Sequence, residues 1–160
     1  MKILFIKLEN FIGVQAAMGV KSVHFDFANI SKPIIQIYGK NRCGKTVLIQ
    51  QLHPFSSINL SGDERSDLSL IIPKETGIKE IGYECNGKVY HITHTYTPTK
   101  SGHTISSSLM CDGKELNPSG GVVIFNGLID QIFGINKYSF QLIINGSQLT
   151  SFGTMSVTQR

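Results

Sequence analysis

The residues best suited to chemistry lie at positions 39–46, where the chain reads GKNRCGKT and matches the pattern G-x-x-x-x-G-K-[ST]. Glycines at both ends of such a loop let the backbone turn tightly, so that successive amide groups point inward and hold phosphate oxygens. The lysine reaches the β- and γ-phosphates, and the hydroxyl that follows it binds the accompanying magnesium ion. The pattern therefore predicts a nucleotide site.

Most residues of this loop can be given a role. Lys45 is expected to neutralise phosphate charge and is the predicted catalytic residue, while Thr46, at the start of a helix, is predicted to bind magnesium. The expected ligands are ATP and Mg²⁺. The residues predicted to contact the nucleotide are Gly39, Asn41, Arg42, Cys43, Gly44, Lys45, Thr46 and Val47.

Two positions of the loop are unusual. Arg42 stands where many such loops carry a second inner glycine. If this position requires a positive φ, arginine is strained there by about 1 kcal/mol. Alternatively, its guanidinium group adds a positive charge beside the phosphates. We interpret Cys43 as a small side chain that fills a tight loop, in preference to a redox switch.

The segments on either side of the loop fit the order strand, loop, helix. Residues 33–38 read PIIQIY, an apolar run rich in β-branched residues that predicts a buried strand. Residues 47–52 carry apolar side chains at helical spacing, and His53-Pro54 predicts the end of that helix.

Length and composition indicate one globular domain. The chain has 160 residues, of which 41% are hydrophobic and 16% charged, enough for a sizeable core. No apolar run approaches the roughly 20 residues that a membrane-spanning helix needs. Three widely separated cysteines fit neither a disulfide framework nor a zinc site, so we expect a reducing, cytoplasmic compartment. The net charge of +4 is compatible with nucleic acid but does not establish it.

Two strands are expected on the N-terminal side of the loop. Residues 3–8 form an apolar run, and Val23, Phe25 and Phe27 alternate with polar residues, with residues 13–19 as a turn region between the two strands. This β-rich layer argues against a small nucleotide or metabolite kinase, which usually opens directly with the strand and its phosphate loop.

Hairpins are expected beyond the loop. Residues 78–85 and 88–96 flank Asn86-Gly87, whose two residues tolerate a positive φ and so favour a tight hairpin turn. A second hairpin is predicted from residues 104–110 through Asp112-Gly113 to Leu116, with residues 97–102 linking the two hairpins. Both hairpins are expected to be antiparallel.

The C-terminal third begins with a helical pattern. From residue 119 the apolar positions fall on one face as far as Phe133, and Gly134 predicts the end of the helix. Residues 140–144 then predict another buried strand, and the polar stretch 56–69 predicts a solvated loop. Together these elements predict an α/β fold with a substantial antiparallel portion.

The order of these segments resembles one family. A strand ending in Leu8-Glu9-Asn10-Phe11, the loop GKNRCGKT, the hairpins, the amphipathic helix and SFQLIINGSQLTSF near the end are similar to the N-terminal half of an SMC or SbcC-type ATPase head. The resemblance is strongest to the ATPase subunit of bacteriophage recombination nucleases, and it covers residues 1–160. It implies the P-loop NTPase fold of an ABC-type head lobe and a role in DNA recombination or double-strand-break processing.

The resemblance also implies a glutamine-glycine pair that contacts magnesium and senses the γ-phosphate. The chain has Asn145-Gly146-Ser147-Gln148 at that place. Matching the glycine selects Asn145, whereas matching the residue type selects Gln148 with a shift in register. We assign Gln148 as the second magnesium ligand and keep Asn145 as the alternative.

Several elements that hydrolysis needs in such heads lie, by the resemblance, in a C-terminal half beyond a long coiled coil. They are a strand ending in Asp-Glu, a Ser-Gly-Gly signature from a partner head, and a late histidine. Residues 122–126 lack the acidic pair, and Pro118-Ser119-Gly120-Gly121 precedes the magnesium-sensing segment, so we interpret it as a turn into a helix. Residues 1–160 are therefore expected to form an N-terminal lobe, either as a fragment or as a natural half-head.

The expected partners follow from the same resemblance. They are the C-terminal half of the head or a second head, a nuclease subunit, and DNA as a further candidate, with no membrane. The alternative function is a truncated, catalytically inactive head that acts as a protein-interaction or regulatory module. In the first case, this chain would supply only half of the residues that an ATPase site needs.

Other clusters predict no separate chemistry. Strand alternation places His91 and His94 on opposite faces, so with His103 they do not converge on a metal. Lys100 and Lys114 are interpreted as surface lysines, although either could touch a DNA backbone.

Overall fold

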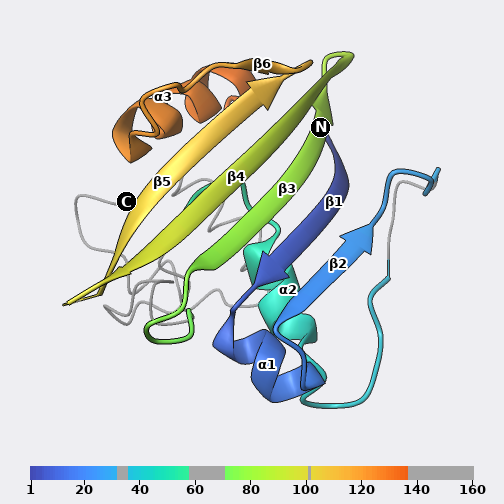
Figure 1. Ribbon diagram of the computed structural model, residues 1–160. Helices are drawn as coiled ribbons and strands as arrows, with labels where there is room; N and C mark the ends of the chain where they lie inside the picture. Colours follow the sequence, from blue (N-terminus) through green and yellow to red (C-terminus); the bar gives the residue numbers. More distant parts are fainter. Residues whose placement is uncertain (32–35, 58–70, 101, 137–160) are drawn as a thin grey trace, which may run out of the picture.

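The computed structural model describes residues 1–31, 36–57, 71–100 and 102–136. One antiparallel sheet dominates this part of the chain, and its strands lie in the order β2-β1-β3-β4-β5-β6 (Figure 1). The strands are β1 (Lys2–Glu9), β2 (Ser22–Asp26), β3 (Gly77–Cys85), β4 (Lys88–Thr99), β5 (Gly102–Cys111) and β6 (Lys114–Glu115). The helices of the described residues are α1 (Ile12–Met18), α2 (Lys45–Gln51) and α3 (Val122–Phe133). The fold is therefore α/β, with the predicted antiparallel portion.

Both predicted hairpin turns are confirmed. Asn86 and Gly87 have φ values of 52° and 73°, and Asp112 and Gly113 have values of 46° and 84°. These left-handed conformations match the twist of the flanking strands, which is why such dipeptides favour hairpins. The link predicted at residues 97–102 is shorter than expected, because β4 and β5 stay paired as far as Thr99 and Gly102.

The turn region predicted at residues 13–19 is wrong, because this segment forms helix α1. Gln15, two alanines and Met18 are good helix formers, and Val14 is buried beneath them. Gly19 then ends the helix in the left-handed conformation with φ of 70°, and its amide donates to the Gln15 oxygen. Gly19 therefore marks the end of α1, and Gly13 marks the point where α1 contacts Val47.

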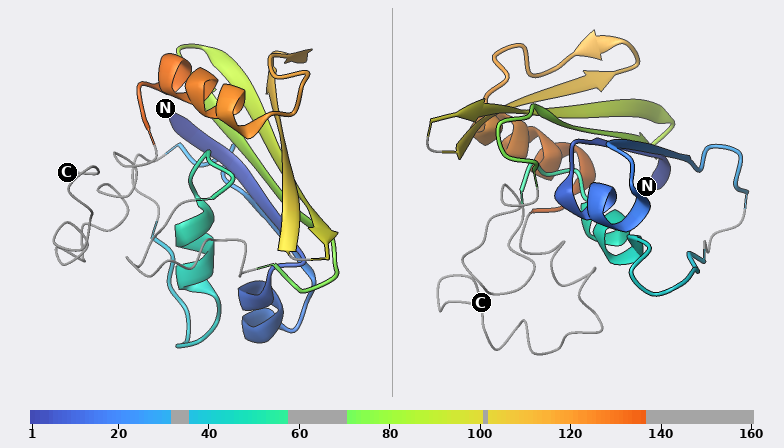
Figure 2. Two further views of the ribbon diagram at one scale, coloured as in Figure 1. Left: turned by 90° about the vertical axis from the view of Figure 1, so that its left-hand side faces the viewer. Right: turned by 60° about the horizontal axis from the view of Figure 1, so that its bottom comes forward.

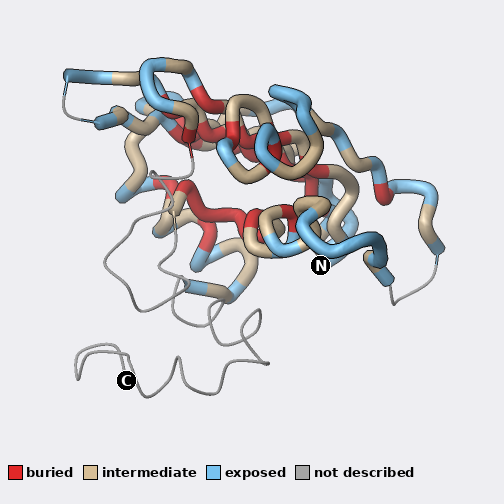
Figure 3. Tube along the Cα trace, turned by 90° about the horizontal axis from the view of Figure 1, so that it is seen from below, coloured by how far each residue is buried: buried red, intermediate tan, exposed pale blue. Residues whose placement is uncertain are grey.

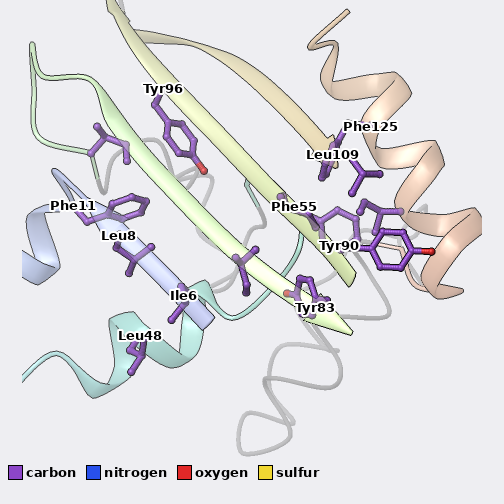
Figure 4. Close-up of a cluster of buried hydrophobic side chains, with 14 of the residues drawn as sticks. Ile6, Leu8, Phe11, Leu48, Phe55, Tyr83, Tyr90, Tyr96, Leu109 and Phe125 are labelled. Atoms are coloured by element: carbon purple, nitrogen blue, oxygen red, sulfur yellow. The ribbon is translucent and has the colours of Figure 1, made fainter. Parts of the chain in front are cut away.

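Helices α2 and α3 lie on the same face of the sheet, and α1 lies near one end of it (Figure 2). Buried positions follow the facing sides of these layers, while exposed positions lie at the strand tips and outer surfaces (Figure 3). The core includes Ile6 and Leu8 of β1, Leu48 of α2, and Leu109 of β5 near Phe125 of α3 (Figure 4). The sheet thus provides one largely apolar face that holds both helices.

The buried strand predicted at residues 33–38 is not seen in its described part. Residues 36–39 belong to no strand, and the side chain of Tyr38 is 86% exposed. The sheet of the described ranges consists of β1 to β6, and residues 36–39 are paired with none of these strands. The strand predicted at residues 140–144 and nearly all of the loop predicted at residues 56–69 lie outside the described residues.

The predicted ends of the remaining helices are confirmed, but Val123, which the sequence pattern places on the apolar face of α3, is exposed, while Phe125 and Ile129 are buried. Helix α2 ends before His53, and α3 ends at Phe133, directly before Gly134, which has φ of 65°. Gly120 adopts a left-handed turn and Gly121 precedes the first residue of α3, as predicted for a turn into a helix. None of the helices in the described ranges is long and apolar enough to span a membrane.

Candidate phosphate-binding site

The loop at residues 39–46 turns through two left-handed residues before it enters α2. Gly44 has φ of 83° and directly precedes the first helical residue, and Arg42 has φ of 64°. Glycine adopts such values without strain, whereas arginine does so at a cost because of its Cβ atom. The positive φ considered for Arg42 is therefore present.

The ammonium group of Lys45 is bound by the loop itself. Nζ donates to the backbone oxygens of Gly39 at 2.8 Å and Lys40 at 2.7 Å. It also lies 3.7 Å from the Sγ atom of Cys43. A phosphate oxygen that carries charge is a stronger acceptor than a neutral carbonyl, so a bound phosphate could compete for this ammonium group.

A hollow of about 320 Å³ lies against the loop. This volume is at the lower end of the range for small-molecule sites. Almost all of the predicted contact residues line it, namely Asn41, Arg42, Cys43, Gly44, Lys45, Thr46 and Val47. Gly39 is not among the lining residues, although its oxygen holds Lys45. The structure therefore gathers the predicted set around one cavity.

Helix α1 forms one wall of this hollow through Gly13 and Ala17. A methyl group added at Gly13 would lie 2.5 Å from Val47 Cγ2, and one added at Gly44 would lie 3.0 Å from Met18 Cε. Helix α1 therefore packs directly against the loop and the first turn of α2. Sequence reasoning missed this wall because it treated the segment as a turn. The signal available in the sequence was the pair of small residues Gly13 and Ala17, whose spacing of four positions places them on one face of a helix.

The charge of the hollow suits an anion. Arg42 and Lys45 both line it, and none of the described residues that line it carries a carboxylate. Thr46 adds a hydroxyl group, so the donor set matches a phosphate chain, with magnesium carried in on the phosphate oxygens. Within the described ranges, no group of three or more His, Cys, Asp or Glu residues could hold a metal ion by itself. Gln148 and Asn145 lie outside the described residues.

The position of α2 is fixed by the segment that follows it. Buried or partly buried side chains of β3 and β4 donate hydrogen bonds to the backbone oxygens of this segment. The pairs are Tyr83 to Leu52 at 3.2 Å, His94 to Pro54 at 2.8 Å, Lys79 to Phe55 at 3.1 Å, and Tyr96 to Ser56 at 2.6 Å. Because the loop leads into α2, these bonds also hold the loop in place relative to the sheet.

Protonation of these donors follows from their partners. A carbonyl oxygen only accepts, so His94 Nε2 carries a proton and donates to the Pro54 oxygen, while Nδ1 lies 2.9 Å from the Ser107 hydroxyl oxygen. Burial raises the pKa of Tyr83 well above its ordinary value, so the phenol remains a donor. The Lys79 ammonium also contacts the His53 ring at 3.1 Å. Sequence reasoning had assigned no role to these side chains.

The opposite face of the sheet carries a separate charged group. Glu80 binds the Lys7 ammonium at 2.7 Å and contacts His91 Nε2 at 3.2 Å. Burial favours the neutral carboxyl group, but the hydrogen bond and charge of Lys7, with smaller effects of His91, lower the pKa of Glu80. His91 and His94 thus lie on opposite faces, as predicted, and Lys100 and Lys114 are exposed.

Comparison with known proteins assigns no function to this chain, so the functional argument rests on the site alone. No family model and no curated protein matches this chain. The resemblance to SMC and SbcC heads therefore stays a hypothesis that rests on the residues named for it. The loop, its hollow and its cations carry the functional argument.

Proposed function

We propose that this chain binds ATP with Mg²⁺ through residues 39–46, as the N-terminal lobe of an SMC or SbcC-like ATPase head. The observation that carries the proposal is the single hollow in which Arg42, Lys45 and Thr46 lie together. A motif match alone defines only residue types and spacing. Here two cationic residues and a threonine of the motif line one hollow of about 320 Å³, which supports binding of a phosphate chain.

Each residue then has a defined part in binding. The amides of residues 41–45 hold the phosphate oxygens, and the Lys45 ammonium moves from the loop carbonyls to the β- and γ-phosphates. Thr46 offers its hydroxyl to the magnesium ion, and Gln148, or Asn145 in its place, is proposed as the second magnesium ligand.

The proposal assigns the rest of the head to another half or a second head, acting with a nuclease subunit in DNA recombination or break processing. Tyr38, just before the loop, is 86% exposed, and residues 36–39 pair with no described strand. Aromatic side chains are enriched in protein interfaces, so this segment is our candidate for the contact with that half. The acidic pair for hydrolysis would come from there as well.

Calorimetric titration of the purified chain with ATP and magnesium tests the binding. We expect Lys45→Ala to raise the dissociation constant for ATP by about 10- to 100-fold, because a charged hydrogen-bond donor is lost. Lys40→Ala is the matched control, since it removes an equal charge from the same loop but from a residue outside the hollow. Absence of binding by the wild-type chain, or equal binding by Lys45→Ala, contradicts the proposal.

Turnover gives a second test. We expect the chain alone to hydrolyse ATP poorly, because the proposal places the acidic pair in the other half. A substantial rate that Lys45→Ala abolishes would show that this chain holds a complete catalytic site, and the half-head assignment would then be wrong.

One observation favours the alternative, a protein-interaction or regulatory module whose loop has only a structural role. The Lys45 ammonium is already held by the oxygens of Gly39 and Lys40. If this is its whole function, Lys45→Ala lowers the melting temperature and the wild-type chain binds no nucleotide. Binding of ATP by the wild-type chain excludes this alternative.

A further inference from the structure

Arg42 is the one strained non-glycine residue of the loop. Its φ of 64° lies in the left-handed region, which glycine adopts without a penalty. Within the described residues, its guanidinium group has no hydrogen bond and no ion pair. No hydrogen bond or ion pair from the described residues therefore offsets the strain, and the Arg42 side chain is exposed and available to a ligand.

The surroundings of Arg42 point to an anionic ligand. Arg42 shares the hollow with Lys45, and the other residues of the described ranges that line it are neutral. Two cations in one cavity repel each other until an anion lies between them. Arginine also offers planar, paired donors that match the oxygens of a phosphate group, which a single ammonium group does not.

The position of Arg42 within the loop selects particular phosphates. Backbone amides between the two glycines surround the α- and β-phosphates, so a side chain that starts there lies beside these two phosphates, whereas the lysine after the second glycine reaches the β- and γ-phosphates. Arg42 is in the first group and Lys45 in the second. The two cations therefore divide the phosphate chain between them.

We propose that Arg42 is a second phosphate-binding cation, which holds the α- and β-phosphates and therefore contributes equally to nucleoside diphosphate and triphosphate binding. This inference rests on the proposed function, because it requires the hollow to be a nucleotide site. Arg42 would then hold the diphosphate as well as the triphosphate, while Lys45 would favour the triphosphate over the diphosphate.

The test is calorimetric titration with adenosine, ADP and ATP in the presence of magnesium, using Arg42→Gly and Arg42→Gln. We expect both variants to bind ADP and ATP about 10- to 100-fold more weakly, by the same factor for both nucleotides, and adenosine unchanged. Arg42→Gly also raises the urea midpoint of unfolding because the strain is relieved, whereas Arg42→Gln keeps the strain. Lys40→Ala, the control for general charge, leaves both affinities within about threefold.

The outcomes separate this inference from the proposed function. Unchanged or tighter ADP binding by both variants overturns the role of Arg42 while nucleotide binding by the wild-type chain stands. Loss of ATP binding alone also overturns it, because the guanidinium group would then act on the γ-phosphate. If the wild-type chain binds none of the three ligands, the proposed function fails and this inference fails with it.

Discussion

The contact between α1 and α2 can be tested through Gly13. A methyl group at this position would lie 2.5 Å from Val47 Cγ2 and 3.3 Å from Cγ1. Carbon atoms pack best at about 3.5–4.0 Å, so Gly13→Ala forces the two helices apart or rotates a stiff β-branched side chain. Because both residues line the hollow, the same change disturbs the loop.

Two opposing effects set the magnitude. Alanine is favoured over glycine in a helix by up to about 1 kcal/mol, whereas overpacking costs about 1–3 kcal/mol. We therefore expect Gly13→Ala to lower the free energy of unfolding by about 1 kcal/mol. In a Val47→Ala background the two Cγ atoms are absent, so Gly13→Ala should instead stabilise the chain by up to about 1 kcal/mol.

Urea unfolding of the wild-type chain, both single variants and the double variant measures this change of sign. The four curves must share one slope, so that midpoints report stability. The expected coupling between the two positions is about 2 kcal/mol. If Gly13→Ala stabilises the chain equally in both backgrounds, α1 does not pack against Val47 and the wall of the hollow is misplaced.

Further predictions concern glycines, a buried amide and pH. Gly87→Ala should lower the free energy of unfolding by about 1 kcal/mol, because φ is 73° there. Gly127→Ala should raise it by about 1 kcal/mol, because Gly127 lies in α3 with open space for a methyl group. The urea midpoint of each variant tests these two predictions. Gln51 is buried, and its amide atoms have no partner in the described part of the chain, so Gln51→Leu should raise the melting temperature, and a fall would contradict this reading. The pKa of Glu80 is lowered from 4.5, mainly by Lys7 acting against burial, so its stabilising contribution is present above that value and is lost as pH falls through the lowered pKa. Glu80→Gln should therefore lose less stability than the wild-type chain between neutral and acidic pH, and equal losses would refute the assignment.

Features encoded by neighbouring residues could be predicted from the sequence. Asn86-Gly87 and Asp112-Gly113 set their turns through their own backbone preferences, so both hairpins were recognised. The loop at residues 39–46 was found in the same way, because its chemistry depends on fixed spacing. Strand parity also placed His91 and His94 correctly on opposite faces.

Features that depend on distant contacts were missed. Gly13 is required by Val47, which lies more than thirty positions away, so the sequence around it indicated a turn instead of a helix. The partners of Lys79 and His94 depend on the path of the chain after α2, which local patterns do not encode. Lys79 is two positions from Ile81 in β3, and His94 is two positions from Ile92 in β4, so strand alternation places both polar side chains on the buried face. This signal was available in the sequence.

Residues 39–46 are proposed to hold the phosphates of a nucleotide. Hydrogen exchange of the backbone amides, measured with and without ATP and magnesium, tests it most directly because it reports on the groups that would bind the phosphates. We expect slower exchange at residues 41–46 and at Gly13 to Ala17 of α1, with no change at the Asn86-Gly87 turn. Unchanged exchange at residues 41–46 at saturating nucleotide would contradict it.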